Sequence, residues 1–168
     1  MKNIKMLVST VMVCAMGVFS TLAQNNETSY FSGNELSLGL GTTYTTENGF
    51  NKTYDFNLDV SASYFVTKYF GITATLPFYS NHGVSVDRVS AGLVARLPIK
   101  AIAPYISVGS QYQWLDKDFN YYAAGGVEWR FAKKWGVYIE DRYIVDALSK
   151  TDIKVGQNQI RAGISLVF

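Results

Sequence analysis

The sequence contains a single cysteine, Cys14, and a single histidine, His82. Cys14 falls in an N-terminal stretch that we expect to be removed, so the mature chain has neither a disulfide nor thiol chemistry. Without further cysteine or histidine, the chain has no ligand set typical of a transition-metal site. Its glycines fall inside predicted strands, which argues against a phosphate-binding loop between a strand and a helix. We therefore expect no metal site and no cofactor.

Long apolar runs are also absent, except at the N-terminus. Residues 1–23 begin with two lysines, continue with a mostly apolar run and end in small residues up to Ala23. This order is typical of a secretory signal peptide. The apolar run is shorter than the roughly 20 residues that a membrane-spanning helix needs. We therefore predict export and cleavage after Ala23, and no helical membrane span in the rest of the chain.

The predicted mature chain has no excess of positive or negative charge. Loss of Lys2 and Lys5 lowers the number of basic residues from 15 to 13, which equals the number of acidic residues. A neutral chain has no basic surface of the kind that binds nucleic acid. The remaining length fits one domain. We expect a polar periplasmic lead-in over 24–34 and a single folded domain over 35–168.

The sequence has, instead, an alternation of apolar and polar residues. In 53–65, for example, Phe56 and Leu58 alternate with Asn57 and Asp59. This period of two predicts a β-strand with one apolar and one polar face. The segments with this pattern are 35–45, 53–65, 70–79, 86–98, 103–115, 120–131, 135–145 and 157–168. The connections alternate between tight turns and mostly longer polar loops, so the strands should form an antiparallel up-and-down sheet.

The polar faces of these strands hold charged residues as well as serines. Those residues are Asp55, Asp59, Arg88, Arg96, Glu128, Arg130, Glu140, Arg142 and Arg161. Two soluble folds, a lipocalin-like barrel and a jelly-roll sandwich, also have alternating strands, but they would bury the apolar face. Aromatic residues near the strand ends and strands of about 10–13 residues favour a membrane barrel instead. We predict an eight-stranded antiparallel transmembrane β-barrel in a bacterial outer membrane, with both termini in the periplasm.

The last third of the chain resembles a known family. The stretch "AAGGVEWRFAKKWGVYIEDRYI" (123–144) resembles paired strands of the OmpA/OmpX-like small outer-membrane barrels, and "PYISVGSQY" (104–112) resembles the strand before them. The C-terminal "RAGISLVF" is similar to the assembly signal of outer-membrane proteins. The residues of that signal are Arg161, Gly163, Leu166 and Phe168. The resemblance implies insertion by the outer-membrane assembly machinery and contact with outer-membrane lipid or lipopolysaccharide. It implies no single activity, because one fold serves several roles.

The interior charges allow two interpretations. Glu128, Arg130, Glu140 and Arg142 should be neighbours across one hairpin, where they form either a gated ion path or a plug of paired charges. An eight-stranded barrel is just wide enough for its side chains to fill, and buried charges need partners. We therefore predict a plugged, monomeric barrel with a structural or interaction role. A narrow porin-like channel and an adhesin or ligand binder acting through loop 146–156 remain alternatives.

Two positions fit this account less well. "YSNH" (79–82) partly matches the His-x-Ser-Asn step of lipid A deacylases, but Phe78 stands where that step has its histidine, so we do not expect an enzyme. Asp141 falls on the lipid face between Ile139 and Tyr143, where the family usually has an aromatic residue. A carboxylate is disfavoured there. The explanations are a local bulge that turns Asp141 inward, a position above the hydrocarbon, or a partner for its carboxylate, and we expect one of the first two.

Overall fold

The protein forms eight β-strands in a computed structural model that describes residues 30–47, 55–78, 86, 88–114, 117–146 and 156–168. The predicted signal peptide, Ser80, His82 and most of loop 146–156 lie outside the described residues. The strands are β1 (Glu35–Glu47), β2 (Asp55–Phe65), β3 (Phe70–Phe78), β4 (Arg88–Arg96), β5 (Ile102–Gln113), β6 (Asp118–Arg130), β7 (Trp135–Asp146) and β8 (Gln157–Val167). Within the described residues, no helix is both long and apolar enough to cross a membrane.

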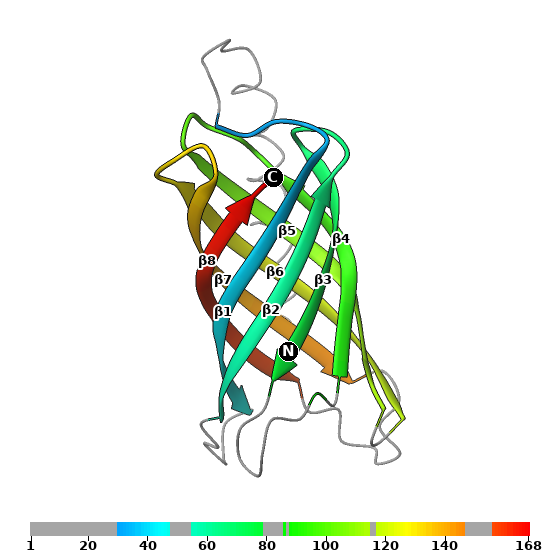
Figure 1. Cartoon of the computed structure of the whole chain (residues 1–168). Coiled ribbons are helices and arrows are strands. Elements are labelled where there is room, and N and C mark those ends of the chain that lie inside the picture. Colours follow the sequence, from blue (N-terminus) through cyan, green and yellow to red (C-terminus); the bar gives the residue numbers. More distant parts are fainter. Residues whose placement is uncertain (1–29, 48–54, 79–85, 87, 115–116, 147–155) are drawn as a thin grey trace, which may run out of the picture.

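The strands close into one antiparallel barrel in chain order, and β8 pairs with β1 (Figure 1). The closing register pairs Leu38 with Leu166 and Thr43 with Arg161. Closure leaves no open sheet edge, which is a requirement for strands in a bilayer. The predicted fold class is therefore confirmed, and the C-terminal segment is the strand that completes the barrel.

Short turns connect the strands at the end of the barrel where the chain ends (Figure 1). Residues 66–69 join β2 to β3, 97–101 join β4 to β5, and 131–134 join β6 to β7. Hydrogen bonds within these turns include Thr67 N–H to Phe70 O at 3.2 Å and Ile99 N–H to Ile102 O at 2.7 Å. Short turns are typical of the periplasmic end of outer-membrane barrels, so we call this end the periplasmic mouth.

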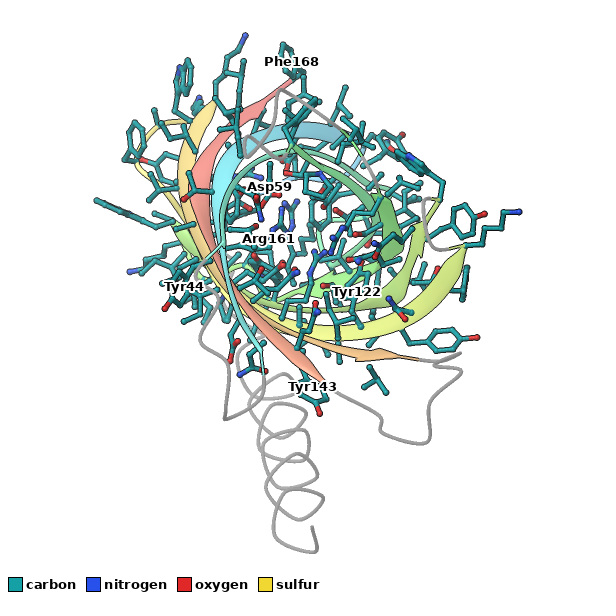
Figure 2. All side chains as sticks on the ribbon, turned by 90° about the horizontal axis from the view of Figure 1, so that it is seen from below. Tyr44, Asp59, Tyr122, Tyr143, Arg161 and Phe168 are labelled. Carbon is teal, nitrogen blue, oxygen red and sulfur yellow. The ribbon has the colours of Figure 1, made fainter. Side chains whose placement is uncertain are left out.

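Side chains alternate between the lumen and the outer wall. Seen along the barrel, Asp59, Tyr122 and Arg161 lie inside the ring, and Tyr44, Tyr143 and Phe168 lie outside it (Figure 2). The outer wall is apolar: Leu93 is 64 % exposed, whereas Arg130 inside is 0 % exposed. A soluble barrel or sandwich would have the opposite arrangement, so both soluble alternatives are wrong. The apolar wall needs a lipid environment.

The dimensions of the barrel fit a membrane. The shortest strands, β3 and β4, have 9 residues each. At about 3.3 Å per residue and a tilt of about 40°, such a strand spans about 23 Å along the barrel axis. The apolar band of outer-membrane barrels is about 25 Å tall. Exposed aromatic rings flank this band, with Trp129 and Trp135 near the periplasmic mouth and Tyr121 and Tyr143 near the opposite end.

The expected bulge at Asp141 is not present. Pairing of β7 is continuous on both sides, and Asp141 lies opposite Gly125 of β6 and Ile160 of β8. Its side chain is exposed on the outer wall. Asp141 and Tyr143 are two positions apart on β7, which is about 5 Å along the axis of a tilted strand. Asp141 therefore faces the membrane, slightly closer to the periplasmic mouth than Tyr143. A bulge does not explain its position on the lipid face.

Candidate functional site

The lumen is filled by two clusters of paired charges and is the candidate functional site. Period-two alternation on all eight strands directs one set of side chains inward, where the narrow barrel brings opposite walls into contact. The buried charged side chains in the described part of the chain are Glu35, Asp59, Arg96, Glu128, Arg130, Glu140, Arg142 and Arg161. Four are acidic and four are basic. These eight side chains together carry no net formal charge.

The first cluster lies at the periplasmic mouth and is centred on Glu35. We call Glu35, Arg96, Glu128 and Arg130 the mouth cluster. Arg130 Nη2 donates to Glu35 Oε1 at 2.5 Å, and Arg96 Nη1 donates to the same oxygen at 2.8 Å. Arg130 Nε also donates to Glu128 Oε1 at 3.1 Å. One carboxylate thus bridges two arginines from β4 and β6, strands that do not pair with β1.

The second cluster lies deeper in the barrel and is centred on Arg161. We call Asp59, Glu140, Arg142 and Arg161 the central cluster. Arg161 Nε donates to Asp59 Oδ2 at 3.1 Å, and Arg161 Nη1 donates to Glu140 Oε1 at 2.8 Å. Arg142 Nη2 lies 3.0 Å from Glu140 Oε1. The hydroxyl of Thr43 donates to Asp59. These contacts join β2, β7 and β8 across the lumen.

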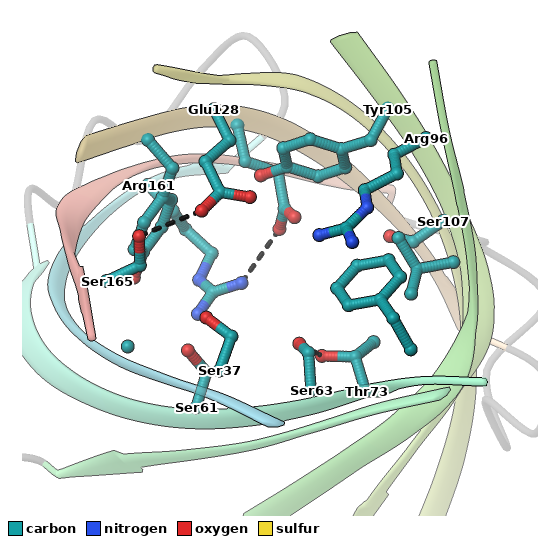
Figure 3. A pocket seen from close by; sticks show the side chains of 15 residues that line it. Ser37, Ser61, Ser63, Thr73, Arg96, Tyr105, Ser107, Glu128, Arg161 and Ser165 are labelled. Atoms are coloured by element: carbon teal, nitrogen blue, oxygen red, sulfur yellow. Dashed lines mark hydrogen bonds and ion pairs between the residues drawn. The ribbon is translucent and has the colours of Figure 1, made fainter. Parts of the chain in front are cut away.

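A polar cavity separates the two clusters. Its volume is about 70 Å³, and serine and threonine side chains line it together with Tyr105, Tyr138 and Arg161 (Figure 3). Some buried polar atoms around it have no protein partner, namely Ser107 Oγ, the Tyr138 hydroxyl and Arg161 Nη2. A polar cavity of this size has room for several water molecules, which satisfy such atoms. The lumen therefore has two charged layers with a small cavity between them that has room for water.

Tyr138 fits into the lumen because glycines face it. Its hydroxyl lies against Gly41 of β1 and Gly163 of β8, the strand that pairs with β7. A Cβ atom at Gly163 would approach that hydroxyl to 2.7 Å, closer than real Cβ contacts. The glycines thus make room for a large ring in a barrel that is otherwise too narrow. This position of the ring closes part of the space beside the central cluster.

The arrangement of the charges differs from the sequence-based expectation in one respect. Glu128 and Arg130 pair with each other along β6, and Glu140 and Arg142 pair along β7. Arg130 has a further charged partner in Glu35 on β1, and Glu140 has one in Arg161 on β8, so the hairpin β6–β7 does not form a four-residue cluster of its own. The reason is the register, which places Glu128 opposite Tyr138 and Glu140 opposite Gly126. The pair on β6 therefore lies in the mouth cluster, and the pair on β7 lies in the central cluster.

Two predicted interior residues, Arg88 and Asp55, are not among the residues that define the two clusters. Arg88 is half-buried at the wall of a smaller polar space near Asp59 and Arg142. Asp55 begins β2 by its backbone pairing, and its side chain lies outside the described part of the structure. No group of three or more potential metal-ligating side chains occurs within the described residues. The expected polar interior thus consists mainly of the two clusters.

Sequence inspection missed Glu35, the acidic residue that holds the mouth cluster together. Glu35 is 3 % exposed. The available signal was its position, because Glu35 shares its face of β1 with the polar-side residues Ser37 and Gly39. A charged residue at the first position of a strand is easily taken for part of a polar lead-in. Only the closed barrel brings it within reach of Arg96 and Arg130.

A closed barrel with an apolar outer wall and a polar, charged interior places the protein in the class of outer-membrane β-barrel proteins. The sequence matches the family model described as "Outer membrane protein beta-barrel domain" over residues 11–168, and the chain belongs to this family. Its place is therefore the bacterial outer membrane. No curated protein matches the sequence.

Solved structures show the same fold at low sequence identity. The N-terminal β-barrel domain of Pseudomonas aeruginosa OprF aligns with a TM-score of 0.63 and 12 % identity, covering 82 % of this chain and 99 % of that one. A de novo designed transmembrane β-barrel aligns with a TM-score of 0.58 and 15 % identity over 81 % and 97 % of the two chains. Ail, the attachment invasion locus protein of Yersinia pestis, gives 0.53 and 15 % over 81 % and 99 %. At these identities the likeness is one of fold.

Proposed function

We propose that this protein is a structural or surface-interaction component of the outer membrane, with a lumen closed to ions and no enzymatic activity. The observation behind the proposal is the balanced set of four buried acids and four buried arginines, which pair inside the lumen in two layers. A hydrated ion entering such a lumen has to displace a paired charge, and breaking a buried pair costs about 3–5 kcal/mol. The lumen therefore acts as a plug.

Conductance across a planar lipid bilayer tests this proposal. We expect the wild-type protein to give no stepwise currents. Glu140 and Arg161 lie directly opposite each other on β7 and β8, so a variant with both replaced by alanine removes half of the central cluster without changing the net charge. We expect stepwise openings when Glu35 and Arg130 of the mouth cluster are replaced by alanine as well, because each cluster alone closes the lumen. The matched control is Ile160→Ala, which shortens a lipid-facing side chain next to Arg161 and should leave the barrel silent.

A narrow channel is the second candidate. The cavity of about 70 Å³ and the partnerless atoms around it favour this candidate, because a space large enough for water is already present between the two layers. Stepwise currents from the wild-type protein, with an ion preference that changes in the Glu140→Gln variant, would mean that the lumen is a channel and not a plug. The conductance experiment therefore separates the two functions.

The proposed partners are outer-membrane lipid and lipopolysaccharide, which surround the barrel, and the assembly machinery, which acts during insertion. We expect the protein to be a monomer and not to bind nucleic acid. The loop-mediated alternative depends on residues 146–156, most of which lie outside the described residues. The deacylase alternative depends on Ser80 and His82, which also lie outside them. Deacylation of lipid A that is lost in His82→Ala would contradict the non-enzymatic proposal.

A further inference from the structure

The segment before β1 turns into the periplasmic mouth and buries an aromatic ring there. Phe31 is 3 % exposed, whereas Tyr30 next to it is 42 % exposed. A polar lead-in of a barrel has no need to bury a phenylalanine, since its other residues face solvent. Phe31 therefore occupies a site, and the residues that surround it define what that site recognises.

Two arginines of the mouth cluster contact the ring of Phe31. Arg130 Cζ lies 4.0 Å from the ring centroid, and Arg96 Cζ lies 4.9 Å from it. Arg96 also lies 3.5 Å from the ring centroid of Phe65, on β2. A guanidinium over an aromatic face is attracted by the ring, and the attraction grows when water is excluded. The ring of Phe31 thus binds to charges that Glu35 already holds in place.

The same arginines bind the backbone on both sides of Phe31. Arg130 Nη1 donates to the carbonyl oxygen of Tyr30 at 2.9 Å, and Arg96 Nη2 donates to that of Ser32 at 2.9 Å. The N–H of Ser32 donates to Glu35 Oε2 at 3.1 Å. Backbone contacts of this kind do not depend on the side chains of Tyr30 and Ser32. The site therefore recognises one aromatic residue between two peptide carbonyls.

The position of this site determines what its occupant does. Glu128 and Arg96 of the mouth cluster, and Phe65 beside them, also line the cavity between the two charged layers. The backbone of Tyr30 is tied to the rim of the barrel, because its N–H donates to Lys100 O at 3.1 Å. Residues 30–34 consequently lie between the cavity and the periplasm.

We propose that the mouth cluster and Phe65 form a binding site for an aromatic residue of an extended peptide, and that Phe31 fills it so that residues 30–34 seal the cavity from the periplasm. The seal is a separate element from the central cluster, because the three hydrogen bonds that hold residues 30–32 at the mouth are made with Arg130, Arg96 and Glu35. Loss of the aromatic ring opens the mouth while the central cluster keeps the lumen closed further along the barrel. Opening of the seal is therefore measured as access from the periplasm to the cavity, and not as ion conductance.

The accessibility of a cysteine in the cavity tests the seal. Because Cys14 is the only cysteine of the chain, a Cys14→Ser, Ser37→Cys protein has one thiol, located on the cavity wall. In lipid nanodiscs we expect a membrane-impermeant thiol reagent to label this protein slowly. Phe31→Ala should raise the labelling rate at least about tenfold, since two cation–π contacts and the burial of the ring favour the closed seal. Heat-modifiable migration shows that each variant is folded.

Three further variants separate recognition of the ring from a general effect of the segment. Tyr30→Ala is the matched control, because this neighbouring ring is exposed, and it should leave the labelling rate unchanged. Phe31→Tyr should restore slow labelling, and Phe31→Leu should not. Equal labelling rates for Phe31→Ala and the parent protein would overturn the seal. Equal protection by leucine and phenylalanine would overturn the aromatic site.

Discussion

Replacement of Glu35 by glutamine is the sharpest energetic test of the lumen network. Glu35 is 3 % exposed and pairs with both Arg96 and Arg130. The substitution keeps the size of the side chain but leaves two buried arginines with one remaining acid, Glu128. Removing one partner of a buried ion pair costs about 3–5 kcal/mol. We expect the free energy of unfolding to fall by this amount, which is a reduction of at least about a hundredfold in the folding constant.

Urea titration of the protein in lipid vesicles measures this change. The 3 tryptophans of the chain, Trp114, Trp129 and Trp135, are all at least 39 % exposed on the outer wall, so their fluorescence reports loss of the barrel from the membrane. The slope of the titration should not change, because the amount of surface exposed on unfolding stays the same. The control is Lys133→Gln, which removes an exposed charge at the same end and should change the free energy by less than about 0.5 kcal/mol.

A double variant shows whether the effect belongs to the ion pair. Arg96→Met alone leaves Glu35 with one arginine and should also destabilise the barrel. If the two side chains interact as described, the Glu35→Gln, Arg96→Met protein loses less stability than the sum of the single variants, by about 1–3 kcal/mol. A loss of less than about 1 kcal/mol in Glu35→Gln, or strict additivity in the double variant, would refute the argument.

Three other changes have definite expected outcomes. Asp141→Leu should stabilise the barrel in bilayers by up to about 2 kcal/mol, because a lipid-facing carboxylate is disfavoured; destabilisation in urea titration would mean that Asp141 has a partner. Tyr138→Phe should change stability by less than about 1 kcal/mol, because its hydroxyl has no protein partner, whereas Tyr138→Ala should cost about 3–5 kcal/mol; equal losses by the same assay would contradict this. Deletion of Phe168 should lower the amount in the outer membrane more than it lowers the stability of the refolded barrel; unchanged amounts in membrane fractions would show that the terminal aromatic is not required for assembly.

The fold is largely readable from the sequence because one physical constraint acts on every strand. A barrel in a membrane needs an apolar outer face throughout, so residues such as Leu36, Leu38 and Leu40 repeat at every second position. Parity alone then places Glu140, Arg142 and Arg161 inside. The strand count follows from the same pattern, and the closing pair β1–β8 follows because an open edge is not tolerated in lipid.

The contacts within the lumen are less accessible from the sequence. They depend on which inward residues lie at the same height, and this height is set by the register between strands that are far apart in the chain. Glu35 and Arg130 are 95 residues apart, yet they form the shortest ion pair of the mouth cluster. Alternation predicts that both point inward, but it does not predict that they meet. The same limitation applies to Phe31, which precedes the first strand and belongs to no alternating pattern.

Asp141 illustrates where local patterns mislead. Its charge conflicts with its lipid-facing position, and a bulge is the natural explanation when only one strand is considered. The continuous pairing to Gly125 and Ile160 excludes that explanation. A charged residue that remains on the lipid face despite this cost is a candidate for function in its own right.

A scan of β7 by spin labels in lipid bilayers tests the central claim, that the outer wall faces lipid and the lumen is closed. Single labels at 137, 139, 141 and 143 report the outer wall, and labels at 136 and 138, which replace no charged residue of either cluster, report the lumen. We expect high accessibility to oxygen, which is concentrated in lipid, at the odd positions. At the even positions we expect low accessibility to both oxygen and a water-soluble nickel complex. Strong access of the nickel complex at even positions would show an open lumen, and high oxygen access there would reverse the two faces of the barrel.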